Sequence, residues 1–332
     1  MSLSGRPKGE SQSAQHEAAP INLPGRPEGE SRGAEHAATR ASRTRSWRAL
    51  ASPWLFLAPA LLVFIWFKFI PMLQGLKMSF YQVRFADADI WVGWDNFQRV
   101  FNDEALAAAA GRTLLYVVVT VILSAMIAIV LAQALQGTAR HVRIVRTAIF
   151  LPAVTSAAVV AEIWRILYAP TATGVVNTAL GWVGIAPQGF FADPDQALAA
   201  LMAMHVWKHV PYDTVIFIAG LAGVNRELYD AAAVDGANAW RRFVHVTLPG
   251  LAPAITVVIA LGFIRGFRVF TEVYATTGGG PAGSTEVVMT QIYKQGFQDL
   301  DFGYAAAASS VLFLFTALTT AAFLAWRRKA AA

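Results

Sequence analysis

Six apolar segments, each about as long as a helix that crosses a bilayer, dominate the chain after residue 50. A membrane-crossing helix needs about 20 consecutive apolar residues, and its backbone polar groups have to be satisfied within the segment. Of the 332 residues, 56% are hydrophobic and only 14% are charged, which is too apolar for a soluble domain of this size. The sequence therefore predicts an all-α membrane protein with six transmembrane helices. The predicted spans are 54–80, 113–135, 148–168, 197–221, 252–270 and 304–325.

Basic residues in the loops predict the orientation of these spans. They gather before span one, between spans two and three, between spans four and five, and after span six. Because cytoplasmic loops carry the excess of Lys and Arg, both termini are expected in the cytoplasm. The acidic loops around Asp87, Asp193 and Asp299 are then expected outside. This distribution also accounts for the net charge of +6, so no nucleic-acid partner is expected.

Residues 1–46 differ in composition from the rest of the chain. They are rich in Gly, Pro, Ser, Glu and Arg and lack the large apolar side chains that would offset the entropy of ordering them. We expect a disordered cytoplasmic N-terminal tail at 1–46 and a transmembrane domain at 47–332. No secretory signal is expected, because such a signal needs an apolar core near its start.

The polar segment 225–249, between spans four and five, indicates two short helices with a break. Leu228–Val234 is rich in Ala and favours a helix. Gly236 suits the positive φ of a helix end. A helical pattern resumes at Ala239 and is expected to stop at Leu248-Pro249. A compact helix joined to two spans is what a partner protein needs in order to push on a membrane domain; an amphipathic loop lying on the bilayer surface is the alternative.

This segment resembles the EAA loop of ABC importer permeases. That loop has Glu-Ala-Ala, three residues, Gly, nine residues and then Ile-x-Leu-Pro. The residues that match and are expected to couple to an ATPase are Asp230, Ala231, Ala232, Gly236, Leu248 and Pro249. Asp230 replaces the Glu, and Val246 replaces the Ile, so charge and apolar character are kept.

Further stretches resemble the carbohydrate-uptake permeases, in particular the maltose-type first permease of a two-permease set. These stretches are Trp91–Phe97, Thr277–Pro281, Ile292–Phe297 and Asp301–Ala307. The resemblance runs from about residue 50 to the end of the chain and leaves the N-terminal tail outside. It implies the type I ABC importer permease fold with a cytoplasmic coupling helix, and a multi-pass protein of the plasma (inner) membrane.

The resemblance also implies partners. The chain would pair with a second homologous permease, contact membrane lipid, bind two ABC ATPase subunits through its inner loops, and receive solute from an extracytoplasmic binding protein. The sequence has no Gly-x-x-x-x-Gly-Lys-Ser/Thr phosphate loop. We therefore expect a transport subunit and not an enzyme, with no catalytic residue and no bound cofactor, while the partner ATPase subunits use ATP and Mg.

Charged residues at membrane depth are candidates for the solute pathway, because each costs a few kcal/mol there unless it is paired or hydrated. Arg265, Arg268 and Glu272 are spaced to share one helix face, on which Arg268 and Glu272 would pair. The alternative is a structural pair between Arg265 and Glu162. Aromatic side chains either stack on sugar faces or form the interfacial belt. The predicted pathway residues are Arg265, Arg268, Glu162, Trp164 and Tyr274.

The expected solute is an oligosaccharide or disaccharide. Guanidinium groups suit a phosphate as well as sugar hydroxyls, so glycerol 3-phosphate or another polyol stays open. An ion-driven secondary transporter is a remote alternative, because internal repeats of the kind found in such carriers are not apparent. His205 and His209 lie four residues apart, but a zinc site needs at least one more ligand, and no metal site is expected.

Overall fold

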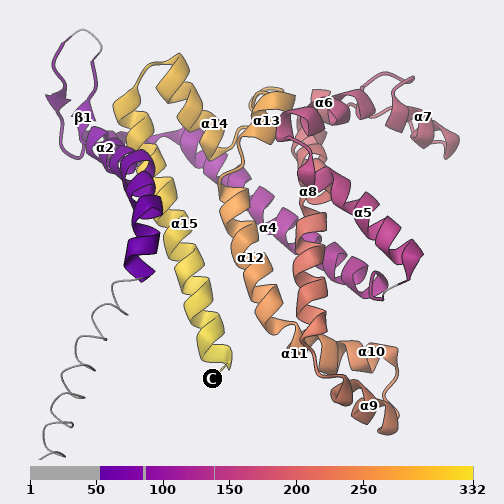
Figure 1. The fold of residues 1–332 in the computed structure, drawn as a ribbon. Helices are drawn as coiled ribbons and strands as arrows, with labels where there is room; N and C mark the ends of the chain where they lie inside the picture. Colours follow the sequence, from indigo (N-terminus) through magenta and orange to yellow (C-terminus); the bar gives the residue numbers. More distant parts are fainter. Residues whose placement is uncertain (1–52, 85–86, 138, 332) are drawn as a thin grey trace, which may run out of the picture. The chain divides into compact units, whose positions relative to one another are not determined.

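The computed structural model describes residues 53–84, 87–137 and 139–331 (Figure 1). The predicted tail 1–46 and the basic residues before span one lie outside the described residues. The chain divides into two units, Met1–Phe69 and Ile70–Ala332. In the first unit a helix starts at Pro53 and closes with a π-helical turn, Ile65–Phe69, where Nζ of Lys68 lies 5.7 Å from the centroid of the Phe64 ring.

The second unit is built from long helices on most of the predicted spans. They are α4 (Glu104–Ala134), α8 (Pro194–Ala222), α12 (Ala252–Phe267) and α15 (Phe302–Ala331), and the nine-residue α2 (Ile70–Met78) precedes them. Shorter helices are α3 (Asp95–Asn102), α7 (Val175–Trp182), α13 (Thr271–Thr276) and α14 (Val288–Tyr293), together with the 3₁₀ turn Phe190–Ala192 and the π-helical turn Lys294–Gln298. The one sheet among the described residues is an antiparallel pair, β1 (Tyr81–Gln82) with β2 (Ile90–Trp91).

Helix α4 begins well before its predicted start at Thr113, because Asp103 caps it. The Asp103 carboxylate accepts hydrogen bonds from the N–H groups of Ala105 and Leu106, and a third at 2.5 Å from the Tyr304 hydroxyl. Partial burial alone would raise the pKa of Asp103, but the bonds from Tyr304, Leu106 and Ala105 outweigh it, so this pKa lies below its usual value. The same carboxylate thus joins the start of α4 to α15.

The predicted third span, 148–168, is broken. α5 (Arg140–Val154) and α6 (Ala157–Leu167) meet at 102°, with Thr155 extended between them and the Ser156 side chain capping α6. Apolar residues flank the bend on both sides, and its two polar residues are too few to end an apolar span by composition. Three helices of the described residues are long and apolar enough to cross a membrane alone, or up to five if each bent pair is one span. The count of six spans stays a prediction.

Close packing between α4 and α12 depends on two glycines of α12. A Cβ added to Gly262 would lie 2.8 Å from Cγ2 of Val121, and one added to Gly266 would lie 2.9 Å from Cγ2 of Val117. Small residues let helix backbones approach closely in membranes, where burial from water does not drive association. Beside this contact, α8 packs on α4 and buries Phe217, Leu201 and Met204.

The connections gather at the two ends of α8 (Figure 1). α9 (Arg226–Val234), α10 (Ala239–Arg242) and α11 (Leu248–Gly250) lie at one end, near the C-terminal end of α15. Helices α6, α7 and α13 lie at the other end. The segment 225–249 and the end of α15 are therefore on the same side of the second unit.

Candidate functional site

The segment 225–249 folds into two short helices, α9 and α10, with the predicted break between them. Asn225 caps α9 by accepting a hydrogen bond from the N–H of Glu227 at 3.0 Å, and Asn238 caps α10 by accepting one from the N–H of Arg241 at 2.9 Å. Gly236 lies between them with a φ of 72°, so the break predicted there is confirmed. These contacts are all local in the sequence.

The stop expected at Leu248-Pro249 falls later in the structure. A π-helical turn, Phe243–Thr247, leads into α11, and the helical path ends only at Gly250, where it meets α12 at 67°. Pro249 occupies one of the first positions of α11, where a missing N–H leaves few helical hydrogen bonds unmade. The helical path therefore ends one residue after the expected stop at Leu248-Pro249.

The α9–α10 pair presents an exposed surface. No residue of either helix is buried. Leu228, Val234 and Trp240 are 53%, 88% and 69% exposed, although all three are large apolar side chains. A Cβ added to Gly236 would meet nothing within 4 Å. The glycine is needed here for its backbone conformation and leaves open space beside it.

Contacts within the segment connect this surface to α12. The Tyr229 hydroxyl of α9 lies 3.0 Å from the Thr247 hydroxyl, and Thr247 is buried in the turn before α11. The N–H of Ala237 bonds to the carbonyl of Ala232 at 2.8 Å and closes the break. Directly after α11, Leu251 is fully buried. These contacts join α9 to the turn that precedes α12.

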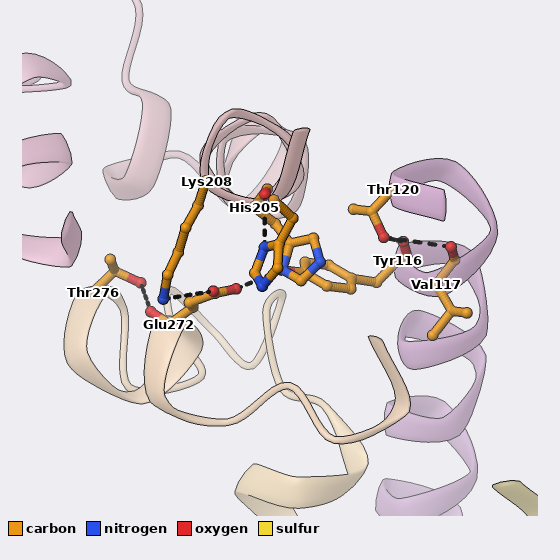
Figure 2. Close-up of polar contacts among 8 residues, drawn as sticks. Tyr116, Val117, Thr120, His205, Lys208, Glu272 and Thr276 are labelled. Atoms are coloured by element: carbon orange, nitrogen blue, oxygen red, sulfur yellow. Dashed lines mark hydrogen bonds and ion pairs between the residues drawn. The ribbon is translucent and has the colours of Figure 1, made fainter. Parts of the chain in front are cut away.

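A second group of polar residues lies buried between α4, α8 and α13. We call it the buried polar cluster; its members are Tyr116, His205, Lys208, His209 and Glu272. Figure 2 shows Lys208 and His205 reaching Glu272 from different sides. Nδ1 of His205 lies 2.6 Å from Oε2 of Glu272, and Nζ of Lys208 lies 3.4 Å from Oε1. The Tyr116 hydroxyl donates to Oε2 at 3.2 Å.

This cluster satisfies a carboxylate that would otherwise be costly. The side chain of Glu272 is 7% exposed, and a buried charge is tolerated only when it is paired and hydrogen-bonded. Its partners come from two other helices, α4 and α8. Glu272 therefore joins α13 to both of them.

The structure separates the predicted pathway residues. α12 ends at Phe267, so Arg268 follows the helix and Glu272 belongs to α13. The expected pair of Arg268 with Glu272 is not formed, because the helix that would have aligned the two side chains is interrupted. Arg268 is exposed, while Glu272 is held by His205 and Lys208.

The other charged candidates also have partners that the sequence did not predict. Arg265 donates to Asp213 of α8 at 2.7 Å, in place of the alternative pair with Glu162. Glu162 instead pairs with Arg165 on its own helix at 3.2 Å. Arg265 thus joins α12 to α8, whereas Glu162 and Arg165 are exposed.

The two aromatic candidates lie in separate ring clusters. Trp164 packs edge-to-face with Tyr168 and Trp207, at centroid distances of 4.8 Å and 5.7 Å. Tyr274 stacks on Phe270 at 5.1 Å and meets Tyr293 at 4.9 Å. No ring contact joins Trp164 to Tyr274 among the described residues, although α6 and α13, the helices that carry them, pack on each other.

Lys208 and Asp213 were missed as candidates by the sequence analysis, although both lie in the predicted fourth span. The signal was present, since an ionisable residue within a span is a functional candidate by default. Their partners could not have been found, because Glu272 lies 64 residues from Lys208 and Arg265 lies 52 residues from Asp213.

Comparisons with known proteins agree with the loop motif. The family described as "Binding-protein-dependent transport system inner membrane component" matches residues 125–329. The chain is 32% identical over 264 residues to the arabinooligosaccharides transport system permease protein of Halalkalibacterium halodurans, covering 79% of this chain and 83% of the relative. It is 31% identical to the sn-glycerol-3-phosphate transport system permease protein of Agrobacterium fabrum, covering 81% and 92%.

Two solved structures of bacterial ABC transporters also match the chain. A bacterial ABC transporter involved in the import of the acidic polysaccharide alginate matches with a TM-score of 0.73 and 26% identity, covering 86% of this chain and 99% of that one. A bacterial alginate ABC transporter in complex with an alginate pentasaccharide-bound periplasmic protein matches with a TM-score of 0.70 and 26% identity, covering 85% and 96%.

Proposed function

Because the chain belongs to the family of binding-protein-dependent transport system inner membrane components, we propose that it forms half of the transmembrane pathway of a carbohydrate importer. It is a permease subunit of an ABC importer. In our proposal the solute is an oligosaccharide or disaccharide delivered by an extracytoplasmic binding protein. A second, related permease forms the other half of the pathway, and two ABC ATPase subunits drive it.

The observation that carries the coupling role is the exposed α9–α10 pair. Leu228, Val234 and Trp240 are large apolar side chains that are exposed beside charged residues of the same connection, and Tyr229 ties that connection to the turn before α12. Apolar anchors with a polar rim are the usual composition of a protein–protein contact. We propose that this surface docks on an ATPase subunit.

Movement of the ATPase subunits would then reach the pathway through two routes. α9 follows directly after α8, and α11 leads directly into α12. Because Asp213 and Arg265 bind α8 to α12, the two helices respond together. ATP binding and hydrolysis on the partners would bias two rigid-body arrangements of the helices, facing inward or outward.

The topology follows from the same assignment. We propose six spans, with α8 as the fourth and the bent pair α5–α6 as the third, and both termini in the cytoplasm. The common side of the segment 225–249 and of the end of α15 supports this orientation. The side that holds α6, α7 and α13 would then face the binding protein.

Glycerol 3-phosphate is the second candidate solute. One relative is a permease for that compound, and Arg268 is exposed and takes part in none of the ion pairs among the described residues. A free guanidinium binds phosphate by paired hydrogen bonds. For a neutral sugar, the aromatic rings of Trp164 and Tyr274 would supply the stacking surface.

The test uses the assembled importer, purified with its partner subunits and reconstituted in vesicles. ATPase activity is measured with binding protein loaded with an arabino-oligosaccharide or with sn-glycerol 3-phosphate. Stimulation by the sugar-loaded protein alone supports the main proposal, and stimulation by the phosphate-loaded protein alone selects the second candidate. If neither stimulates hydrolysis, an arabino-oligosaccharide and sn-glycerol 3-phosphate are both excluded as the solute.

The coupling role is tested in the same vesicles with Val234→Asp. A charge on this exposed side chain is expected to abolish stimulated hydrolysis by preventing docking, while the chain still folds. The matched control is Val183→Asp, at a side chain that is 72% exposed beyond the end of α7. Equal activity of the two variants would contradict docking through α9.

A further inference from the structure

Three potential metal ligands converge in the buried polar cluster. His205 and His209 lie on α8, Glu272 lies on α13, and one ligand atom from each lies within 4.8 Å of the others. We propose that these three side chains form a binding site for a divalent transition-metal ion of the zinc class. The bound ion clamps α13 to α8. This inference goes beyond the transport function and does not depend on the identity of the solute.

The donor set suits zinc. Two imidazoles and one carboxylate are a known zinc ligand set, with a fourth position left for water. Spacing of four residues places both imidazoles on one face of a helix, as in helical zinc-binding motifs. Calcium and magnesium prefer oxygen ligands, so two nitrogen donors favour a transition metal over either.

The orientation of His209 leaves a nitrogen available for a metal. Its Nδ1 lies 3.0 Å from the carbonyl oxygen of His205. A carbonyl only accepts, so Nδ1 carries the proton and Nε2 keeps its lone pair. Nε2 takes part in none of the hydrogen bonds among the described residues. Histidines that bind metals commonly donate their other N–H to a carbonyl or carboxylate in this way.

Binding requires movement of the ligands, because the His205 and His209 rings stack with their centroids 4.0 Å apart and one ring has to turn before both face the ion. Nδ1 of His205 and Oε2 of Glu272 are 2.6 Å apart and share a proton. An ion that replaces this proton needs the two atoms to move apart to about 3.3 Å, the separation of ligands around tetrahedral zinc. His205 and Glu272 are almost fully buried, which excludes bulk water from these two ligands.

Lys208 is the competitor for the same carboxylate. Its Nζ makes the longest contact to Glu272, 3.4 Å, and it approaches from a different side than His205 (Figure 2). The flexible lysine stem lets the ammonium withdraw when a metal ion binds. Lys208 therefore sets how tightly the site binds, and removing its charge should strengthen binding.

The experiment measures metal binding by the full-length chain, purified in detergent without a polyhistidine tag and stripped of metal with a chelator. Bound zinc is determined by equilibrium dialysis, and Co²⁺ serves as a spectroscopic probe through its visible absorption. We expect one zinc ion per chain and a four-coordinate Co²⁺ spectrum. His209→Ala and Glu272→Gln are expected to abolish both.

The chain offers a matched control in His245. Its Nδ1 also lies 3.0 Å from the carbonyl four residues earlier, that of Arg241, but the side chain is exposed and joins no group of three possible metal ligands among the described residues. His245→Ala should bind zinc as the unaltered chain does. If it loses as much zinc as His209→Ala, or if the unaltered chain binds no more than His209→Ala, the site does not exist.

Lys208→Met is expected to increase zinc affinity. It therefore tests the metal site even if His209→Ala or Glu272→Gln fails to fold. Removing the ammonium should tighten zinc binding about tenfold, the scale on which groups around the ligands change metal affinity. Unchanged affinity in Lys208→Met would overturn the proposal. Bound zinc should also raise the thermal midpoint of this variant, because the ion binds the folded state.

Discussion

The α9–α10 pair and the buried polar cluster use polar residues in opposite ways. Asn225 and Asn238 cap helices within three positions of themselves and stay exposed. Glu272 takes partners that lie 64, 67 and 156 residues away and is nearly inaccessible. The first region keeps its shape by local bonds and leaves its surface free for a partner. The second fixes the mutual positions of helices that the sequence keeps far apart.

The strongest test of this difference removes the carboxylate of Glu272. Glu272→Ala leaves Lys208 and His205 without their acceptor in a buried site, and removing one partner of a buried pair costs about 3–5 kcal/mol. We expect a large fall in the free energy of unfolding, measured by denaturant titration in detergent with excess chelator. The chelator keeps this result separate from metal binding.

The double variant Glu272→Gln with Lys208→Met is the control for the charge. It removes both charges and keeps side chains of similar length, so most of the lost stability should return. If Glu272→Ala has the same free energy of unfolding as the unaltered chain, the buried polar cluster does not hold the helices together. The contrast with the α9–α10 pair would then disappear.

Two glycines sharpen the comparison, because the α9–α10 pair and the buried contact between α12 and α4 need a glycine for different reasons. Gly266→Ala pushes a Cβ to 2.9 Å from Val117 and should cost about 1–3 kcal/mol of unfolding free energy through overpacking. Gly236→Ala meets no neighbour but requires a φ of 72°, which costs about 1–2 kcal/mol for an L-residue. The measurement is the denaturation midpoint for Gly266→Ala and hydrogen exchange of α9 and α10 for Gly236→Ala.

Substitution by asparagine distinguishes the need for a left-handed backbone at Gly236 from the need for close packing at Gly266. Asn tolerates a left-handed conformation better than Ala, so Gly236→Asn should lose less protection than Gly236→Ala. At Gly266, Asn is larger than Ala and should be worse. The opposite order at either position would show that the reason assigned to that glycine is incorrect.

Features that depend on residues close together in the sequence could be predicted, and features that depend on distant residues could not. The break at Gly236 depends on a residue and its immediate neighbours, and the apolar spans depend on composition, so both could be predicted. The bend between α5 and α6 was not predicted, because the span was assigned by its overall apolar composition, which the two polar residues Thr155 and Ser156 hardly change. The predicted face of Arg265, Arg268 and Glu272 assumed a continuous helix, and the end of α12 at Phe267 invalidates it.

Partners of the buried charges were beyond prediction for a related reason. Lys208 and Asp213 could have been noted as charges within a span, but nothing local indicates that one faces α13 and the other α12. Such pairs depend on how whole helices pack. The functional roles of Asp230, Ala231, Ala232, Leu248 and Pro249 likewise stay predictions, because their partner is another protein.

The smallest expected effect concerns the cap of α10. Asn238→Ala removes the acceptor for the N–H of Arg241 and should destabilise this four-residue helix by about 1 kcal/mol. Because neither α9 nor α10 has a buried residue, the loss should stay local and leave the global denaturation midpoint unchanged.

Trypsin measures this local loss of stability directly, since Arg241 and Arg242 lie in α10. Cleavage there should become about fivefold faster, the population change that corresponds to 1 kcal/mol. Asn238→Asp keeps a capping oxygen and should cleave like the unaltered chain. A shift of the global midpoint in Asn238→Ala would mean that the α9–α10 pair is part of the cooperative fold and is not the locally held surface that docking requires.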